Sequence, residues 1–289
     1  MQNTCFVCNQ PAAKTIHAKE ATMYCCNNCG SQWQWPLQEE KIYEDLYSEK
    51  YYKEIWGWSE RTDTQVGISK YVTTKKFIKL LHNQKKGGKV LDIGCGLGYL
   101  LSFLQQDNYA YEVYGVELSA FARTTSEKRV GKGRIFENIE QIKKKKIQFD
   151  AILMFDSMEH IPNQEKLLKD IDTLLIPNGK VFVIMPAADS FAARIMGKYW
   201  IEYKKDHVLF YTKKGLEKQL EKYHFQIKYQ KTTWKKVTLA YLASYLSVFR
   251  IFGISKILEK IVHILPQPIK NIPVSFPIGQ MMVVFEKKL

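Results

Sequence analysis

The sequence has few acidic residues for its number of basic ones. Its 29 Asp and Glu residues stand against 43 Lys and Arg residues, which gives a formal net charge of +14. Such a positive charge is typical of proteins that bind nucleic acid or an acidic membrane surface, and it can also serve solubility alone. No charged stretch followed by a cleavable apolar segment opens the chain, so we predict a cytoplasmic protein. Residues 237–254 approach membrane-spanning length, but Arg250 and three Ser or Thr residues argue against a span.

A turn with three glycines is the most informative stretch. The apolar run 90–93 ends at Gly94, and Gly96 and Gly98 follow before a helical pattern begins. Because glycine has no side chain, a ligand can approach the backbone of such a turn closely. A second strand, 113–116, delivers Glu117 about twenty residues later, where an acid accepts both hydroxyls of a ribose.

This order of strand, glycine turn, helix, strand and acid resembles the class I S-adenosylmethionine-dependent methyltransferases. The spacing Gly94-x-Gly96-x-Gly98 differs from the Gly-x-Gly-x-x-Gly of dinucleotide enzymes. The resemblance continues through 149–162, which contains Glu-His-Ile-Pro, and through 174–186. It implies an α/β fold: a Rossmann-like, seven-stranded, doubly wound sheet with an antiparallel last strand. The remaining strands are then expected at 135–136, 225–229 and 281–285.

The resemblance also implies S-adenosyl-L-methionine as cofactor and assigns residues to its binding. Asn138, after the short strand 135–136, corresponds to the position that holds the adenine amino group. The implied cofactor-binding set is Asp92, Gly94, Gly96, Gly98, Glu117, Asn138, Phe155 and Asp156.

Two Cys-x-x-Cys pairs near the N-terminus predict a structural zinc ribbon over residues 1–35. Cys5 and Cys8 are separated by seventeen residues from Cys26 and Cys29, a spacing that suits four thiolates around one Zn²⁺. So short a segment needs the metal for its stability. Disulfides are the alternative, which a cytosolic location disfavours. Cys25 is an alternative ligand to Cys26, and spacing favours Cys26.

Residues 36–75 are predicted to form an aromatic-rich helical linker or lid. This stretch and the few residues before it contain eight Trp and Tyr residues: Trp33, Trp35, Tyr43, Tyr47, Tyr51, Tyr52, Trp56 and Trp58. Its Tyr-Tyr pair resembles a segment that, in bacterial methyltransferases, folds over cofactor and substrate. Packing between modules is the alternative for so many aromatics. The methyltransferase domain would then span 76–289.

An apolar helical insertion is predicted at 237–275, between the last two strands. Its segment 237–265 suits a cap over the active site or an amphipathic helix at a membrane surface. Lys235 and Lys236 precede it on the expected substrate side, which suits an anionic lipid or a lipid-linked substrate at the inner membrane. The lysines of 143–146 fall at the amino ends of the strands, away from the chemistry.

His160 and His207 are the candidate catalytic bases. Methyl transfer from a sulfonium is an in-line displacement that depends on alignment, and a hydroxyl nucleophile also needs a base. A hydrogen-bonded histidine without a catalytic role is the alternative at each position. Asp156, Glu159 and His160 also resemble a carboxylate–carboxylate–histidine cluster of the ubiquinone-pathway O-methyltransferases, which implies a divalent metal as a further alternative.

We therefore predict methyl transfer to a small-molecule, sugar or lipid-linked acceptor, at oxygen. No Asn-Pro-Pro-Tyr tetrapeptide and no Pro-Cys pair occurs, which argues against adenine-N6 and cytosine-C5 methylation. One alternative is an rRNA base methyltransferase, because such a family also places a zinc ribbon before this fold. The other is a non-catalytic binding protein that retains the fold.

Overall fold

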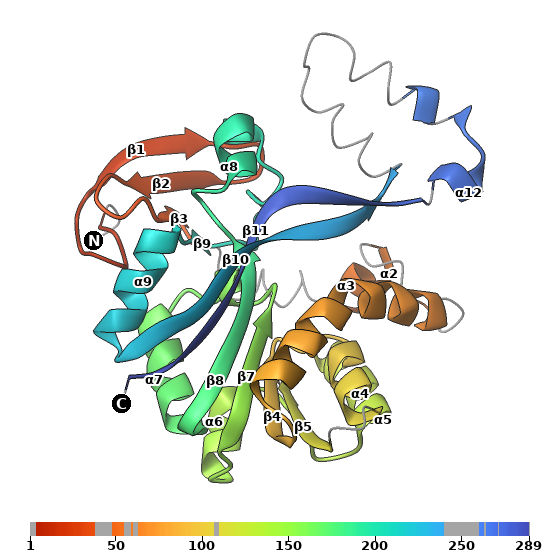
Figure 1. The fold of residues 1–289 in the computed structure, drawn as a ribbon. Helices are drawn as coiled ribbons and strands as arrows, with labels where there is room; N and C mark the ends of the chain where they lie inside the picture. The colour runs from red at the N-terminus through yellow and green to blue at the C-terminus, as the bar shows by residue number, and fades with distance from the viewer. Residues whose placement is uncertain are drawn as a thin grey trace.

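A central seven-stranded sheet dominates the computed structural model, which describes residues 4–37, 48–54, 59, 63–106, 110–239, 260–262, 264–270 and 272–288 (Figure 1). The strands lie in the order β10-β11-β8-β7-β4-β5-β6, with β11 antiparallel to both its neighbours. Their bounds are β4 Gly88–Ile93, β5 Tyr111–Val116, β6 Ile135–Phe136, β7 Phe149–Phe155, β8 Leu175–Pro186, β10 Phe225–Thr238 and β11 Pro273–Lys287. The predicted fold class, with its antiparallel last strand, is confirmed.

Helices cover both faces of this sheet. One face packs against α3, α4 and α5, and the other against α6, α7 and α9. The apolar stripe of α7, which follows helical spacing in the sequence, is buried as expected. The helices are α2 Glu49–Glu54, α3 Asp63–Gln84, α4 Tyr99–Gln106, α5 Ala120–Val130, α6 Ile139–Lys144, α7 Gln164–Leu174, α8 Phe191–Met196, α9 Lys213–Lys222 and α12 Gln267–Lys270, with single turns η1 Met158–His160 and η2 Gly197–Tyr199.

The strand order reverses between β4 and β7. The chain passes from β4 outward to β5 and β6, and then returns to β7 on the other side of β4. Loops that leave neighbouring strands in opposite directions leave room for a ligand at the carboxyl ends of those strands. The glycine turn follows β4 and the Glu-His-Ile-Pro loop follows β7, so both lie at this point.

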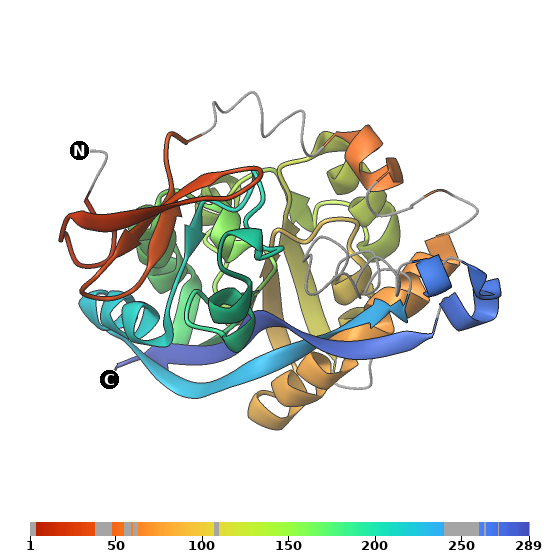
Figure 2. The same ribbon diagram turned by 90° about the horizontal axis from the view of Figure 1, so that it is seen from above.

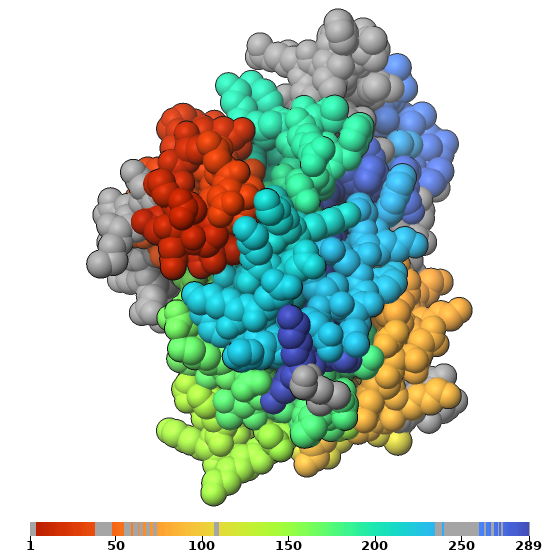
Figure 3. Space-filling model, turned by 60° about the vertical axis from the view of Figure 1, so that its left-hand side comes forward, coloured from red at the N-terminus to blue at the C-terminus, as the bar shows by residue number. Residues whose placement is uncertain are grey.

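The N-terminal residues form a second, smaller sheet that includes a strand from the methyltransferase part. Strands β1 Ala12–His17, β2 Thr22–Cys26 and β3 Gln32–Gln34 are antiparallel, and β9 Leu209–Phe210 pairs with β3. The ring of Phe6 lies 5.2 Å from that of Tyr211, and the N-terminal module lies directly against α9 in Figure 3. The N-terminal module therefore shares a sheet with the larger domain.

The prediction of a helical insertion over 237–275 is wrong at both ends. Residues 237–238 continue β10 and pair with 273–274 of β11, so the two strands form a long arm beyond the main sheet (Figures 1 and 2). β-Branched Thr232, Thr233, Val237 and Thr238 favour strand at this place. Short helical segments occur at 260–262 and in α12, whereas 240–259 lie outside the described residues.

Much of the predicted aromatic lid also lies outside the described residues, including Tyr43, Tyr47, Trp56 and Trp58. Trp33 lies in β3, where it stacks on Tyr24 at a centroid distance of 6.1 Å. Packing within the N-terminal module therefore accounts for Trp33.

We predict that Thr212→Val destabilises the junction between the N-terminal module and α9. The Thr212 hydroxyl donates to the carbonyl oxygen of Cys29 at 2.5 Å and accepts from the amide of Gly215 at 2.9 Å. Leaving these buried groups unpaired costs about 1–3 kcal/mol, measurable by urea unfolding. Thr124→Val is the matched control, because its exposed hydroxyl bonds only to the carbonyl of Ala120. Equal losses in both variants would contradict the proposed junction.

Candidate functional site at the carboxyl ends of the strands

The glycine turn after β4 has a shape that only glycine fits. Gly94, Gly96 and Gly98 have φ angles of 83°, 54° and 78°. A side-chain carbon at Gly94 would lie 2.6 Å from Cβ of Ser157, and one at Gly98 would lie 2.3 Å from Oγ of Ser126. The turn is therefore held between the loop after β7 and helix α5, and of its three glycines Gly94 is exposed.

Two buried carboxylates stand beside this turn. Oε2 of Glu117 accepts a hydrogen bond from the amide of Gly96 at 2.8 Å, and Oε1 accepts one from Ser119 at 2.9 Å. Burial, together with the nearby charge of Glu117, raises the pKa of Asp92 to about 7. Burial also raises the pKa of Glu117. A ligand that carries positive charge and donates hydroxyl hydrogen bonds would stabilise both acids, so the site fits S-adenosylmethionine.

Tyr52 completes this side of the site and was not among the predicted binding residues. It is buried in α2 against Leu97 and Tyr99, with its ring 5.9 Å from that of Phe121. Burial and the neighbouring carboxylate of Glu117 raise the pKa of the Tyr52 hydroxyl. The Tyr-Tyr pair in the sequence indicated this segment. The sequence did not indicate that Tyr52 lies beside Glu117, because the two residues are far apart along the chain.

The other predicted binding residues occupy different environments. Phe155, at the end of β7, packs on Phe77 at a centroid distance of 5.5 Å. Asp156 has a left-handed φ of 54° and accepts a hydrogen bond from Nε2 of Gln280 at 2.5 Å. Asn138 is exposed and caps α6, where its side chain accepts from the amide of Gln141. The capping role alone accounts for Asn138, so its adenine contact stays a prediction.

His160 and His207 meet in space although they are far apart in the sequence. Their rings are 4.7 Å apart and nearly perpendicular. Nδ1 of His160 lies 2.8 Å from the carbonyl oxygen of Asp206, and Nδ1 of His207 lies 3.7 Å from a carboxylate oxygen of Glu202. The side chain of His207 is 5% exposed and that of His160 is 18% exposed. Of the two rings, that of His160 is therefore the more exposed.

Glu159 is the most unusual side chain of the site. It is 1% exposed, and both its carboxylate oxygens lack a hydrogen-bond partner among the described residues. Burial and the neighbouring Asp156 raise the pKa of Glu159 well above its usual value. Glu159, His160 and His207 place one ligand atom each within 4.8 Å of the others. The structure thus groups His207, and not Asp156, with Glu159 and His160.

The four predicted zinc ligands also come together. The sulfur atoms of Cys5 and Cys29 are 3.5 Å apart, and those of Cys8 and Cys26 are 3.4 Å apart. All four lie within 4.8 Å of one another. Tetrahedral Zn²⁺ with bonds of about 2.3 Å would place its sulfurs about 3.8 Å apart, so these residues fit the ion. Cys25 is outside the group, and burial raises the pKa of its thiol.

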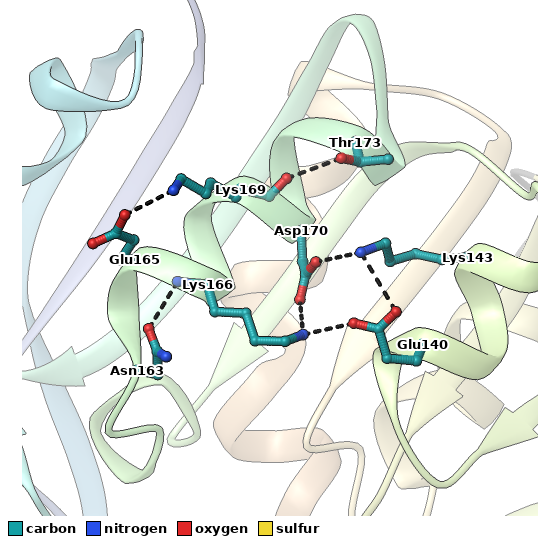
Figure 4. Close-up of a pocket in the computed structure, with 8 residues that line it drawn as sticks. All are labelled: Glu140, Lys143, Asn163, Glu165, Lys166, Lys169, Asp170 and Thr173. Atoms are coloured by element: carbon teal, nitrogen blue, oxygen red, sulfur yellow. Dashed lines mark hydrogen bonds and ion pairs between the residues drawn. The ribbon is translucent and has the colours of Figure 1, made fainter.

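A surface hollow between α6 and α7 is lined mainly by charged side chains (Figure 4). Nζ of Lys143 contacts Oδ1 of Asp170 at 2.8 Å, and Nζ of Lys166 lies between Asp170 and Glu140. Part of the basic cluster 143–146 is thus paired with carboxylates of its own chain. These ion pairs account for the hollow without a ligand.

Comparisons with known proteins agree with this geometry. A family model described as "Methyltransferase domain" matches residues 68–230. A solved S-adenosylmethionine-dependent methyltransferase from Thermotoga maritima shares the fold with a TM-score of 0.52 and 17% identity, over 86% of this chain and 100% of that one. One from Anabaena variabilis has a TM-score of 0.51 and 18% identity, over 86% of this chain and 94% of that one. The family match covers more than half of the sequence, so the chain belongs to this methyltransferase-domain family.

Two curated relatives are similar over a shorter stretch. Phosphoethanolamine N-methyltransferase 1 of Zea mays is 32% identical over 137 residues, which are 46% of this chain and 26% of that protein. Ubiquinone biosynthesis O-methyltransferase of Coxiella burnetii is 29% identical over 102 residues, 34% of this chain and 43% of that protein. The chain thus spans less than half the length of these relatives. The family match confirms the predicted methyltransferase domain, and the solved structures confirm its fold.

We predict that Glu117→Ala weakens binding of S-adenosylhomocysteine by about tenfold or more, because a hydrogen bond to a charged group contributes about 1.5–3 kcal/mol. Calorimetry measures this affinity. Glu117→Gln keeps the shape and controls for lost packing, and Glu165→Ala, at an exposed position of α7, should bind as the unmodified protein does. Unchanged binding in both Glu117 variants would remove this residue from the site.

Proposed function

We propose that this protein transfers a methyl group from S-adenosylmethionine to an oxygen atom of a small-molecule, sugar or lipid-linked acceptor. The observation that supports it most is the joint presence of two features at one edge of the sheet. The glycine turn with Glu117 suits the cofactor, and the His160–His207 pair suits removal of a proton from the acceptor.

The bound cofactor would supply an activated methyl group on a sulfonium, ready for in-line displacement. In this proposal the backbone of Gly94, Gly96 and Gly98 and the carboxylates of Asp92 and Glu117 hold it, with Phe155, Asp156 and Asn138 as the further predicted contacts. Tyr52 closes the site over Glu117 and keeps water away from it.

We assign the two histidines different roles. His160 is the base, because it is the more exposed of the pair, and its Nδ1 faces the carbonyl oxygen and the carboxylate of Asp206. A proton on Nδ1 would bond to that carbonyl, which directs Nε2 to accept the acceptor's proton. His207 is buried between His160 and Glu202 and positions the base. Both histidines are candidates from the sequence, and their burial favours His160 as the base.

The relatives support a small acceptor. One is named for phosphoethanolamine and the other for ubiquinone biosynthesis, and their names differ in whether nitrogen or oxygen is methylated. Oxygen is our choice, because a neutral alcohol needs a base and this site contains one. If the substrate is instead rRNA, the protein should bind RNA with an affinity that falls as salt rises. If the protein is a non-catalytic binding protein, it should bind the cofactor without turnover.

The N-terminal cysteines are proposed to bind one structural zinc ion. Their spacing, their proximity and their place in a short, three-stranded module support it. The module covers the segment that carries His207, so the metal would also stabilise the wall of the proposed active site.

We predict that His160→Asn lowers kcat by a factor of about 10²–10⁴, the usual contribution of a general base, with little change in cofactor affinity. His207→Asn should lower kcat less. Labelled cofactor with a metabolite and lipid extract from a deletion strain provides the assay. His224→Asn, at an exposed position, is the control.

The pH profile tests the same assignment. Burial lowers the pKa of His160, and a base acts in its neutral form. The ordinary pKa of histidine is about 6.5. Activity should therefore persist below that pH and be lost only as the pH falls through the lowered pKa of His160. A profile unchanged in His160→Asn would exclude His160 as the base.

We predict one zinc ion per chain in protein purified without chelators, measured by elemental analysis. Cys8→Ser and Cys29→Ser should lose the metal and unfold more readily, because the ion stabilises the module. Cys25→Ser is the matched control and should keep it, since Cys25 lies outside the ligand group. Freshly reduced protein free of zinc would refute the metal site.

A further inference from the structure

Helix α8 presents an apolar face to the outside. Phe191 and Ile195 of α8 are four residues apart and are 76% and 67% exposed, and Tyr199, in the turn η2 that follows, is 53% exposed. Residues four apart share one face of a helix. The opposite side is anchored, because Ala192 and Ala193 are buried.

The turn after α8 is also firmly attached. The indole of Trp200 is buried and donates a hydrogen bond to the carbonyl oxygen of Ile278 in β11, at 2.8 Å. The exposed side chains of α8 are therefore held in place on a rigid support.

A second apolar surface lies at the tip of the β10–β11 arm. The four isoleucines of this tip, Ile261, Ile264, Ile269 and Ile272, are 47%, 83%, 38% and 47% exposed. In Figure 1, α8 and the arm tip both lie at the upper end of the molecule, and both are in view in Figure 2, which looks down on that end. We call α8, η2 and the arm tip the apical surface. It lies at the carboxyl ends of the parallel strands, on the side of the proposed active site.

The charges of the apical surface have one sign. Arg194 and Lys198 are exposed in α8 and η2, and Lys260 is exposed at the arm tip; the described residues of these elements include no acid. The acids that flank α8 and η2 in the sequence are Asp189 and Asp206, which are half-buried, and Glu202, which is 3% exposed. Positive charge around exposed Phe, Tyr and Ile is complementary to a bilayer with anionic headgroups. A protein partner is less well matched, because lysines are depleted in protein interfaces.

We propose that the apical surface binds the surface of an anionic bilayer. Phe191, Ile195 and the isoleucines of the arm enter the headgroup region, and the basic side chains contact the lipid phosphates. No helix in the described part of the chain is long and apolar enough to cross a membrane. Contact of residues 237–265 with a membrane was predicted from sequence, but α8 was not, and α8 lies entirely within the described structure.

Such binding would bring the active site to lipid-linked acceptors. This last step rests on the proposed function, whereas bilayer binding does not, because it requires neither cofactor nor turnover. The two can therefore fail separately.

The test is sedimentation of the full chain with vesicles of phosphatidylcholine, with and without phosphatidylglycerol. We expect binding to the anionic vesicles that weakens with salt, and little binding to the neutral ones. Arg194→Glu with Lys198→Glu should reduce the partition coefficient at least about tenfold, since each basic residue near such a surface contributes about fivefold. Phe191→Ser with Ile195→Ser should reduce it at every salt concentration.

Two matched controls distinguish position from composition. Lys144→Glu with Lys145→Glu reverses two exposed charges at the amino ends of the strands, and Tyr71→Ser removes an aromatic side chain that is 49% exposed on α3. Both should bind vesicles as the unmodified chain does. A cooperative urea-unfolding transition in every variant verifies that it is folded.

Three results would overturn the proposal. One is no vesicle binding at low salt. Another is equal loss of binding in the control variants, which would show that net charge alone acts. The third is a lipid-independent dimer that Phe191→Ser with Ile195→Ser abolishes, which would assign the apical surface to a second copy of the chain.

Discussion

The reversal of strand order between β4 and β7 is the constraint on which the site depends. Because the chain leaves β4 in one direction and β7 in the other, their loops separate at the carboxyl edge. The hydroxyl of Ser157 bridges them by donating to the carbonyl oxygen of Ile93 at 2.7 Å, and Gly94 has no room for a side chain there. The glycine turn and the Glu-His-Ile-Pro loop are thus held against each other.

The pairing of β3 with β9 extends this arrangement to the N-terminus. The amide of Gln34 donates to the carbonyl oxygen of Val208 at 2.8 Å, and the amide of Val208 donates to that of Glu159 at 2.9 Å. These bonds run from the cysteine module through the segment of His207 to the loop after β7. A module that looks separate in sequence is therefore part of the support of the proposed base.

Electrostatics differ between the two ends of the sheet. At the amino end, Lys85 contacts Asp150 at 2.8 Å and Lys143 contacts Asp170, so part of the positive charge there is compensated. At the carboxyl end, the buried acids Asp92 and Glu117 lie beside the glycine turn, and the basic residues Arg194 and Lys198 are exposed in α8 and η2. Net charge therefore says less about partners than the placement of charge does.

The sequence alone determined what local patterns encode. Strand periodicity, the glycine turn, Glu117 at a strand end and the spacing of four cysteines each reflect chemistry within a short stretch, and the structure agrees with the fold they predict. Contacts between distant segments were decided only by tertiary structure. His160 meets His207, Gln280 reaches Asp156 and β9 joins the N-terminal sheet, because packing, and not local pattern, brings these segments together. The arm likewise could not be predicted from either strand alone, since residues 237–238 pair with 273–274, which follow only after the intervening segment.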